Sequence, residues 1–241
     1  MTRHALFIVF VALAVALGAG ASAFADGVSE NAAFVDGAVK PTKLDKKNYK
    51  PVELFSGVRT ETNITGMQSN PVSEYISYPR NGKFDFNAGD VCTTLPPSGS
   101  TPEQAIAACP ESSYIGSGHA EVWGPGNVPT APDLTVSVFR GPDKRGILLH
   151  TYSPTLLAAA PTVPGSVEKS TAGKEFGYAL SVPHAPVTGA LMITEFSATV
   201  FKSSKAVLGR CKDKTLTFQR RVTYADGSTE TAETTQRCKR K

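Results

Sequence analysis

Apolar and polar residues alternate with a period of two along much of the chain after Pro51. The alternating stretches are short and separated by Gly, Pro, Asn and Asp, which is typical of β-strands joined by turns. The expected strands are Val52–Thr62, Tyr75–Tyr78, Lys83–Phe86, Tyr114–Trp123, Leu134–Phe139, Ile147–Tyr152, Gly177–Val182, Leu191–Phe201, Ala206–Cys211, Leu216–Tyr224 and Thr229–Gln236. The pattern predicts a single all-β domain over residues 51–241, an antiparallel β-sandwich or a jelly-roll-like fold.

The last two expected strands form the clearest hairpin. On the first of them one face carries Leu216, Phe218, Val222 and Tyr224, and the other carries Thr215, Thr217, Gln219, Arg221 and Thr223. Asp226 and Gly227 supply the positive φ angles that a tight hairpin turn requires. The returning arm, Thr229–Gln236, is polar on both faces, so we expect it at a sheet edge.

One short helix is expected, in the segment STPEQAIAAC. Thr101 can cap it, Pro102 suits the first helical position, and Gln104 can complete a capping box. Because the helix spans barely two turns, it needs support from the rest of the structure. The flanking cysteines can provide that support.

The first 50 residues differ from the rest of the chain. Residues 1–25 have a basic start, an apolar run and small residues at the end, which predicts a signal peptide cleaved after Ala25 or after Ala23. Residues 26–50 show no strand or helix period and are expected to be a flexible basic leader. No later run reaches the roughly 20 apolar residues of a membrane span. The mature chain is therefore expected to be secreted, without a span.

The charge is distributed unevenly. The whole chain carries a net charge of +4, which falls to about +3 without Arg3 and is too weak to indicate a nucleic-acid partner. Two clusters stand out, Lys40, Lys43, Lys46, Lys47 and Lys50 near the start of the domain and Arg237, Lys239, Arg240 and Lys241 near residue 241. We interpret them as two solvated, partly flexible ends. The alternative is that they bind an anionic polymer.

Four cysteines in an exported chain permit three disulfide pairings. Cys92 and Cys109 flank the expected helix, while Cys211 and Cys238 lie near the open end of the hairpin. Pairing each with its neighbour needs no long-range crossing, and each bridge would stabilise the fold by roughly 3 to 4 kcal/mol. A zinc site or a redox pair would need closer spacing, such as C-x-x-C, so we expect no metal and no cofactor.

With these features placed, the chain resembles a family of exported proteins of unknown function that is typical of soil actinobacteria. The resemblance rests on the order of PVELFSGVRTETN, TPEQAIAAC, YIGSGHAEV, LTVSVFRGP, LLHTYSP, GYALSVPHAP and the closing hairpin with YADGS. It covers nearly the whole mature domain. It implies export and this organisation, and it assigns no site.

A candidate binding surface lies on the Tyr114–Trp123 strand. By alternation Ile115, Ser117, His119, Glu121 and Trp123 share a face, so a histidine, a carboxylate and the single tryptophan line up. Tryptophan stacks on sugar rings, and a carboxylate can hold hydroxyls or orient an imidazole. The alternative is an ordinary solvent-facing strand with Trp123 beneath a neighbouring loop.

The remaining chemistry is sparse. His150 alternates with Leu148 and is expected at the margin of a core, while His184 lies between prolines in a loop. The sequence has no G-x-S-x-G, H-E-x-x-H or calcium-loop motif, although dispersed carboxylates escape such a search. Glu121 and Glu195 are the first carboxylates to test because each lies inside an expected strand.

These observations favour a secreted or cell-envelope-associated, non-catalytic structural or binding module. The expected partner is an anionic or carbohydrate polymer of the envelope, and nucleic acid is not expected. The alternative is an extracellular hydrolase that acts on polysaccharide through dispersed carboxylates. A deep cleft with carboxylates at glycosidase separations would favour the hydrolase, and a flat sheet face the binding module.

Overall fold

The computed structural model describes residues 31–62, 71–94, 96–124, 128–155, 162–183, 192–225 and 227–241. Eleven strands form one antiparallel sheet in the order β1-β4-β12-β7-β8-β9-β10-β11-β5-β14-β15. Their bounds are β1 Asn31–Lys40, β4 Glu53–Thr62, β5 Pro71–Pro79, β7 Tyr114–Gly124, β8 Val128–Arg140, β9 Gly146–Tyr152, β10 Thr162–Lys169, β11 Phe176–Pro183, β12 Met192–Val200, β14 Thr215–Tyr224 and β15 Thr229–Arg237. The all-β, antiparallel prediction is confirmed.

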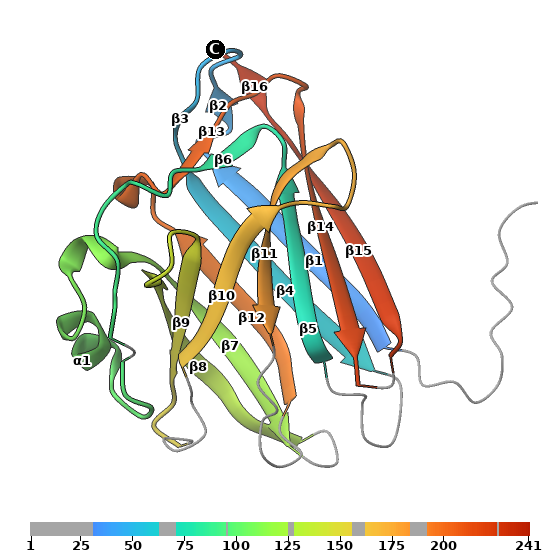
Figure 1. The fold of residues 1–241 in the computed structure, drawn as a ribbon. Coiled ribbons are helices and arrows are strands. Elements are labelled where there is room, and N and C mark those ends of the chain that lie inside the picture. Colours follow the sequence, from blue (N-terminus) through green and yellow to red (C-terminus); the bar gives the residue numbers. More distant parts are fainter. Residues whose placement is uncertain are drawn as a thin grey trace, which may run out of the picture.

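The sheet curls back on itself, so that its two halves face each other as layers. In Figure 1, β10, β11, β5 and β14 lie in front of β7, β12, β4 and β1. The buried side chains that the two layers share include Leu54 and Val58 of β4, Ile76 and Tyr78 of β5, and Phe218 of β14. The two layers of the expected sandwich are thus halves of one continuous sheet.

The two edge strands of this sheet, β1 and β15, lie against each other. The side-chain amide of Gln236 accepts a hydrogen bond from Val39 N at 2.7 Å and donates one to Val39 O at 3.2 Å. Gly37 lies over Phe218, and a Cβ atom there would come within 2.2 Å of the ring. Glycine is therefore required where β1 crosses this aromatic side chain. The expected edge position of β15 is confirmed.

The short elements lie at one end of the molecule and on its outer side. Strands β3 (Lys50–Pro51), β13 (Val207–Gly209) and β6 (Gly82–Phe84) form a small sheet, and β2 (Lys43–Leu44) pairs with β16 (Lys239–Arg240). Among the described residues, 3₁₀ turns span Glu111–Ser113 and Lys202–Ser204. Helix α1 (Pro102–Ala107) has the predicted capping box of Thr101 and Gln104.

The expected flexible leader over residues 26–50 is wrong where the structure describes it, because β1 runs from Asn31 to Lys40 and pairs with β4 along its whole length. Val35 and Val39 are buried, and Gly37 occupies the core position between them. A glycine at a core position removes the apolar signal that period-two alternation relies on. Strand β10 was missed for a related reason, since Pro164 and Gly165 interrupt it.

Candidate functional site

The residues predicted to form a binding surface lie on the outer side of β7. His119 is exposed and its Nδ1 atom lies 3.3 Å from Asp133 Oδ1, with both side chains more than 70% exposed. An ion pair in such open solvent contributes little to stability. Glu121 and Trp123 are half-buried, and Trp123 Nε1 has no hydrogen-bond partner among the described residues.

Ile115 does not share that outer face, contrary to the alternation argument. It is buried in the same interior cluster as Ala120 and Val122. The pairing of β7 with β8 has an irregularity between Tyr114 and Gly116, and a bulge of this kind shifts the alternation by one residue. The predicted surface therefore begins after this irregularity.

Glu121 and Glu195, the carboxylates chosen for a hydrolase test, are register partners on β7 and β12. The sheet encloses a cavity between its two layers, and an open groove lies over β5, β10, β11 and β14. Neither glutamate lines the cavity or the groove. A pair of carboxylates on an outer sheet face lacks the walls that would hold a sugar ring between them. Their arrangement does not add support to the hydrolase alternative.

His150 of β9 is fully buried beneath the loop before α1. Its Nε2 atom lies 3.0 Å from the carbonyl oxygen of Ser100, and its Nδ1 atom lies 3.0 Å from Thr162 Oγ1. Burial lowers the pKa of His150 below its ordinary value, and the hydrogen bond to Ser100 opposes that shift. The expectation of a hydrogen-bonded histidine at a core margin is confirmed. His184 lies outside the described residues.

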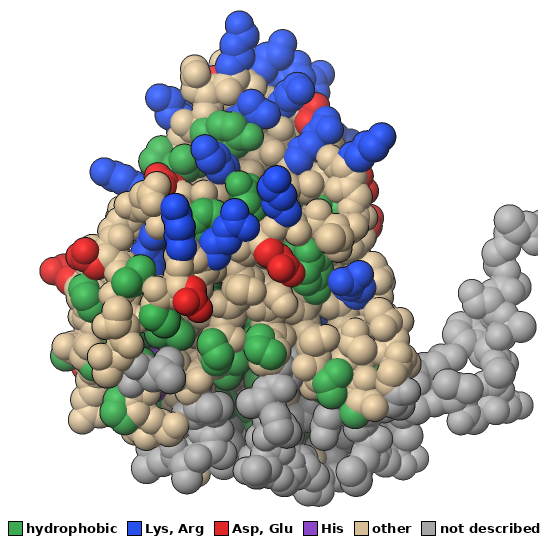
Figure 2. Space-filling view, viewed as in Figure 1, with side chains coloured by type: hydrophobic (Ala, Val, Ile, Leu, Met, Phe, Trp, Pro, Cys, Tyr) green, Lys and Arg blue, Asp and Glu red, His purple; other side chains and the backbone are tan. Residues whose placement is uncertain are grey.

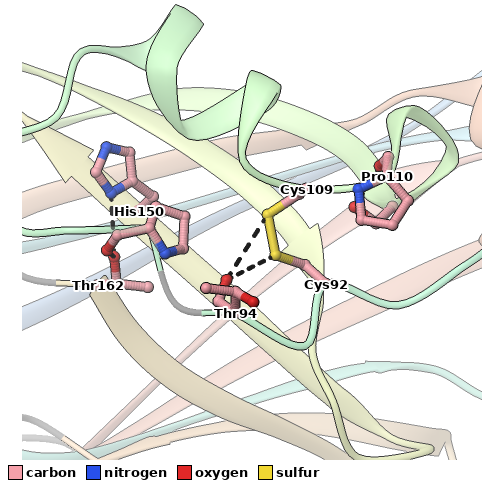
Figure 3. Close-up of a disulfide and its surroundings, with 8 residues drawn as sticks. Cys92, Thr94, Cys109, Pro110, His150 and Thr162 are labelled. Carbon is pink, nitrogen blue, oxygen red and sulfur yellow. Dashed lines mark hydrogen bonds between the residues drawn. A yellow bond between two sulfur atoms is a disulfide. The ribbon is translucent and has the colours of Figure 1, made fainter.

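Both predicted disulfides are present. Cys92–Cys109 attaches α1 to the outer side of the sheet, and the carbonyl oxygen of Thr94 lies 2.9 Å from Cys92 Sγ (Figure 3). Cys211–Cys238 joins the segment after β13 to the end of β15. No cysteine in the described part of the chain is free, and no cluster of metal-ligating side chains occurs there.

The two basic clusters, which the sequence separates by almost the whole domain, form one surface. Strand β16 pairs in parallel with β2, so that Lys239 lies opposite Lys43. Lys50 lies opposite Gly209 in the small sheet. We call this surface the basic end; it comprises Lys43, Lys46, Lys47, Lys50, Arg210, Lys212, Lys214, Lys239, Arg240 and Lys241. In Figure 2 the Lys and Arg side chains gather where β2, β3 and β16 lie.

Backbone hydrogen bonds and a disulfide order the basic end. The amide of Cys211 donates to Asp45 O, and the amide of Cys238 donates to Lys214 O. Arg240 donates through Nη2 to the carbonyl oxygen of Lys212. The Arg210 guanidinium lies 4.5 Å from the centre of the Tyr49 ring, a cation–π arrangement that holds it in place. The two ends are solvated, as expected, but the interpretation of them as separate, partly flexible ends is wrong where these contacts join them.

The acidic side chains of the basic end are engaged by neighbouring donors. Asp45 accepts hydrogen bonds from the amides of Lys47 and Asn48 at 2.7 and 2.8 Å, and those amides, with that of Asn48 first, hold its pKa below the usual range. Asp213 accepts from Asn81 Nδ2 at 3.1 Å and pairs with Arg80.

The lysines and arginines of the basic end are, with the exception of the half-buried Arg210, exposed. None of them lies within ion-pairing distance of a carboxylate in the described ranges. The surface therefore presents unpaired positive charge to solvent. Sequence reasoning found both clusters and missed their union, because the parallel pairing of two-residue strands leaves no periodic signal.

Within the residues that the structure describes, no helix is both long and apolar enough to cross a membrane. A scan against protein-family models found no match, and a search of curated proteins found none either. The resemblance to exported actinobacterial proteins thus remains a prediction from the sequence.

Proposed function

We propose that the protein is a secreted or envelope-associated, non-catalytic binding module that captures anionic envelope polymers through its basic end. The observation that carries the proposal is the pairing of β2 with β16, which places Lys43 beside Lys239 on one ordered surface. The two disulfides are consistent with an oxidising, extracellular location. The signal peptide expected over residues 1–25 supports export.

The electrostatics favour a polymer over a small anion. The positive side chains are spread over an exposed surface, and each exposed charge contributes little alone. A polymer with regularly spaced negative groups contacts several of them at once, so that small contributions add. An ordered surface also loses less conformational entropy on binding than two flexible tails would.

The test is co-sedimentation of the mature protein with isolated bacterial envelopes. We expect binding at low salt and release at 1 M salt, because the Debye length falls from about 10 Å at 0.1 M to about 3 Å at 1 M. The variant Lys43→Gln/Lys47→Gln/Lys239→Gln should bind several-fold more weakly. The matched control Lys144→Gln/Lys169→Gln/Lys202→Gln removes the same charge from exposed positions elsewhere and should bind like the wild type.

Three results would contradict the proposal. The wild-type protein could stay in the supernatant at low salt. The control variant could weaken binding as much as the basic-end variant, which would leave only an effect of net charge. Binding could persist unchanged in 1 M salt, which would point to a different surface, with His119, Glu121 and Trp123 as the first to examine.

A further inference from the structure

The space between the two layers of the sheet contains a cavity of about 60 Å³. Apolar side chains from both layers line most of it, among them Ile76, Ile115, Val138, Leu149 and Phe196. A cavity of about 150 Å³ can hold benzene, which has six carbon atoms, so a cavity of about 60 Å³ has room for about two to three carbon atoms. An apolar cavity offers water few hydrogen bonds, and it therefore favours an apolar occupant.

The cavity reaches the surface beside the turn that joins β8 to β9. Gly141, Asp143, Lys144 and Gly146 of this turn line it, together with Asp85 and Phe86 from the segment after β6. Asp143 and Lys144 are exposed, whereas Gly141 is buried. The cavity thus has an apolar interior and a polar mouth, which is the arrangement of a site for a molecule with one polar end.

Arg140 is the most buried of the charged residues that line this cavity, the others being Asp85, Asp143 and Lys144. It continues the alternation of Val136 and Val138 on the interior face of β8, and its residue surface is only 6% exposed. Its Nη1 atom donates to Phe86 O at 2.9 Å, and its Nη2 atom donates to Asp85 O. Its Nε atom is buried and has no hydrogen-bond partner among the described residues.

The charge of Arg140 is incompletely compensated. The two carbonyl oxygens accept two hydrogen bonds from a guanidinium that has five N–H donors, and they carry no net charge. The carboxylate of Asp85 acts on it only from beyond ion-pairing distance, and no other carboxylate of the described ranges pairs with it. Buried charges are normally paired, because desolvation of an unpaired charge is costly.

We propose that this cavity binds a short-chain aliphatic monocarboxylate, with the carboxylate at Arg140 and the hydrocarbon chain among the apolar side chains of the interior. The negative group supplies the missing charge and an acceptor for Nε. The lining requires an apolar body, and the volume limits the enclosed part of the ligand to about three carbon atoms, the propyl chain of butyrate, with its carboxylate at the mouth beside Arg140. This site is distinct from the basic end, and it goes beyond the proposed function.

The test is a titration of ¹⁵N-labelled protein with butyrate, followed by NMR at the Nε–H resonance of Arg140. We expect saturable shifts with a dissociation constant on the order of 1 mM, given the small number of ligand atoms. Butylamine and 1-butanol have the same chain without the negative charge, and they should bind at least about tenfold more weakly. If 1-butanol binds as well as butyrate, the cavity is an apolar void and the proposal is wrong.

Variants separate the site from non-specific effects. Arg140→Met replaces the guanidinium with an uncharged, apolar side chain of similar length and should weaken butyrate binding at least about tenfold, because it removes a charged hydrogen-bond donor. The control Arg221→Met changes an exposed arginine and should leave the affinity unchanged. Ala198→Leu fills the cavity while Arg140 stays intact, and it should also abolish binding. Binding that survives both Arg140→Met and Ala198→Leu, or no saturable shift in the wild type, would overturn the proposal.

Discussion

Two arginines point into the interior of the curled sheet, and their surroundings differ. Arg220 of β14 is only 2% exposed, and its Nε and Nη2 atoms lie 3.0 and 3.5 Å from the two carboxylate oxygens of Glu74 on β5. Its Nη1 atom donates to Arg59 O at 2.8 Å. Arg140, on β8, has two backbone carbonyls and no carboxylate within ion-pairing distance.

The difference separates a structural arginine from a candidate ligand-binding one. The charge of Arg220 is matched by Glu74, and its Nε, Nη1 and Nη2 atoms each have an acceptor, so the pair is complete without a ligand. A buried pair of this kind adds little net stability, but loss of one partner leaves an unpaired charge. Arg140 already lacks a charged partner within ion-pairing distance among the described residues. Its environment is explained if a negative group occupies the cavity.

The largest expected effect comes from breaking the Arg220–Glu74 pair. Glu74→Gln should lower the free energy of unfolding by about 3 to 5 kcal/mol, because it leaves Arg220 buried without its counter-charge. Urea unfolding followed by circular dichroism measures this change. The matched control is Glu168→Gln on the exposed side of β10, which should change stability by less than about 0.5 kcal/mol. Equal losses in the two variants would show that the buried pair has no special role.

A smaller loss of stability is expected at alkaline pH. It arises from two buried tyrosines, one near Arg140 and one on the strand of Arg220. Burial raises the pKa of Tyr78, beside the cavity, to about 12. Burial and the charge of Glu230 raise the pKa of Tyr224, on the strand of Arg220, to about 12. An unfolded tyrosine loses its proton near pH 10. The folded state therefore retains a proton that the unfolded state releases.

The sign follows from this difference in bound protons. The contribution of these tyrosines to the free energy of unfolding is fully present below about pH 10. It falls as the pH rises from about 10 to 12, by up to about 1.4 kcal/mol per pH unit for each tyrosine. Tyr78→Phe and Tyr224→Phe should each reduce the slope of the unfolding free energy in this range, and the double variant should reduce it most. Unfolding titrations at several alkaline pH values measure the slope. An unchanged slope in the double variant would contradict the assignment.

The smallest of these effects is expected at Arg140. Arg140→Met removes hydrogen bonds to Asp85 O and Phe86 O but also removes a costly buried charge, so the loss of stability should be about 1 kcal/mol. Butyrate at ten times its dissociation constant should stabilise the wild type by about 1.4 kcal/mol and leave Arg140→Met unchanged. Thermal unfolding with and without butyrate measures this. A loss as large as that of Glu74→Gln would make the two arginines equivalent.

Much of the fold could be predicted from the sequence because it depends on local signals. Alternation located most of the strands, and the capping box located α1. Cysteine spacing selected the two disulfides. Strand β1 was missed because Gly37 occupies a core position, where the contact that requires it comes from Phe218 on a distant strand. Closure of the sheet depends on such distant contacts.

The candidate sites were less predictable, although the sequence contains a signal for both arginines. Arg140 follows Val136 and Val138 at a period of two, and Arg220 lies between Phe218 and Val222 on an apolar face. A charge at a core position indicates either a buried partner or a ligand. Which of the two applies depends on residues from other strands, such as Glu74, and alternation does not place those.

The contact between β1 and β15 has a consequence for the order of folding. The backbone of Val39 is hydrogen-bonded by the side chain of Gln236, and Lys43 pairs with Lys239 across two short strands. Both contacts join an early segment to residues almost two hundred positions later in the chain. Long-range pairings of this kind slow folding, because the entropy of closing a large loop is lost before the stabilising contacts form. Contact between the two edge strands, and the pairing of β2 with β16, therefore cannot form before residues 229–240 have been synthesised. Such a delay suits a protein proposed to be exported, since an unclosed chain can still pass through a narrow translocation channel.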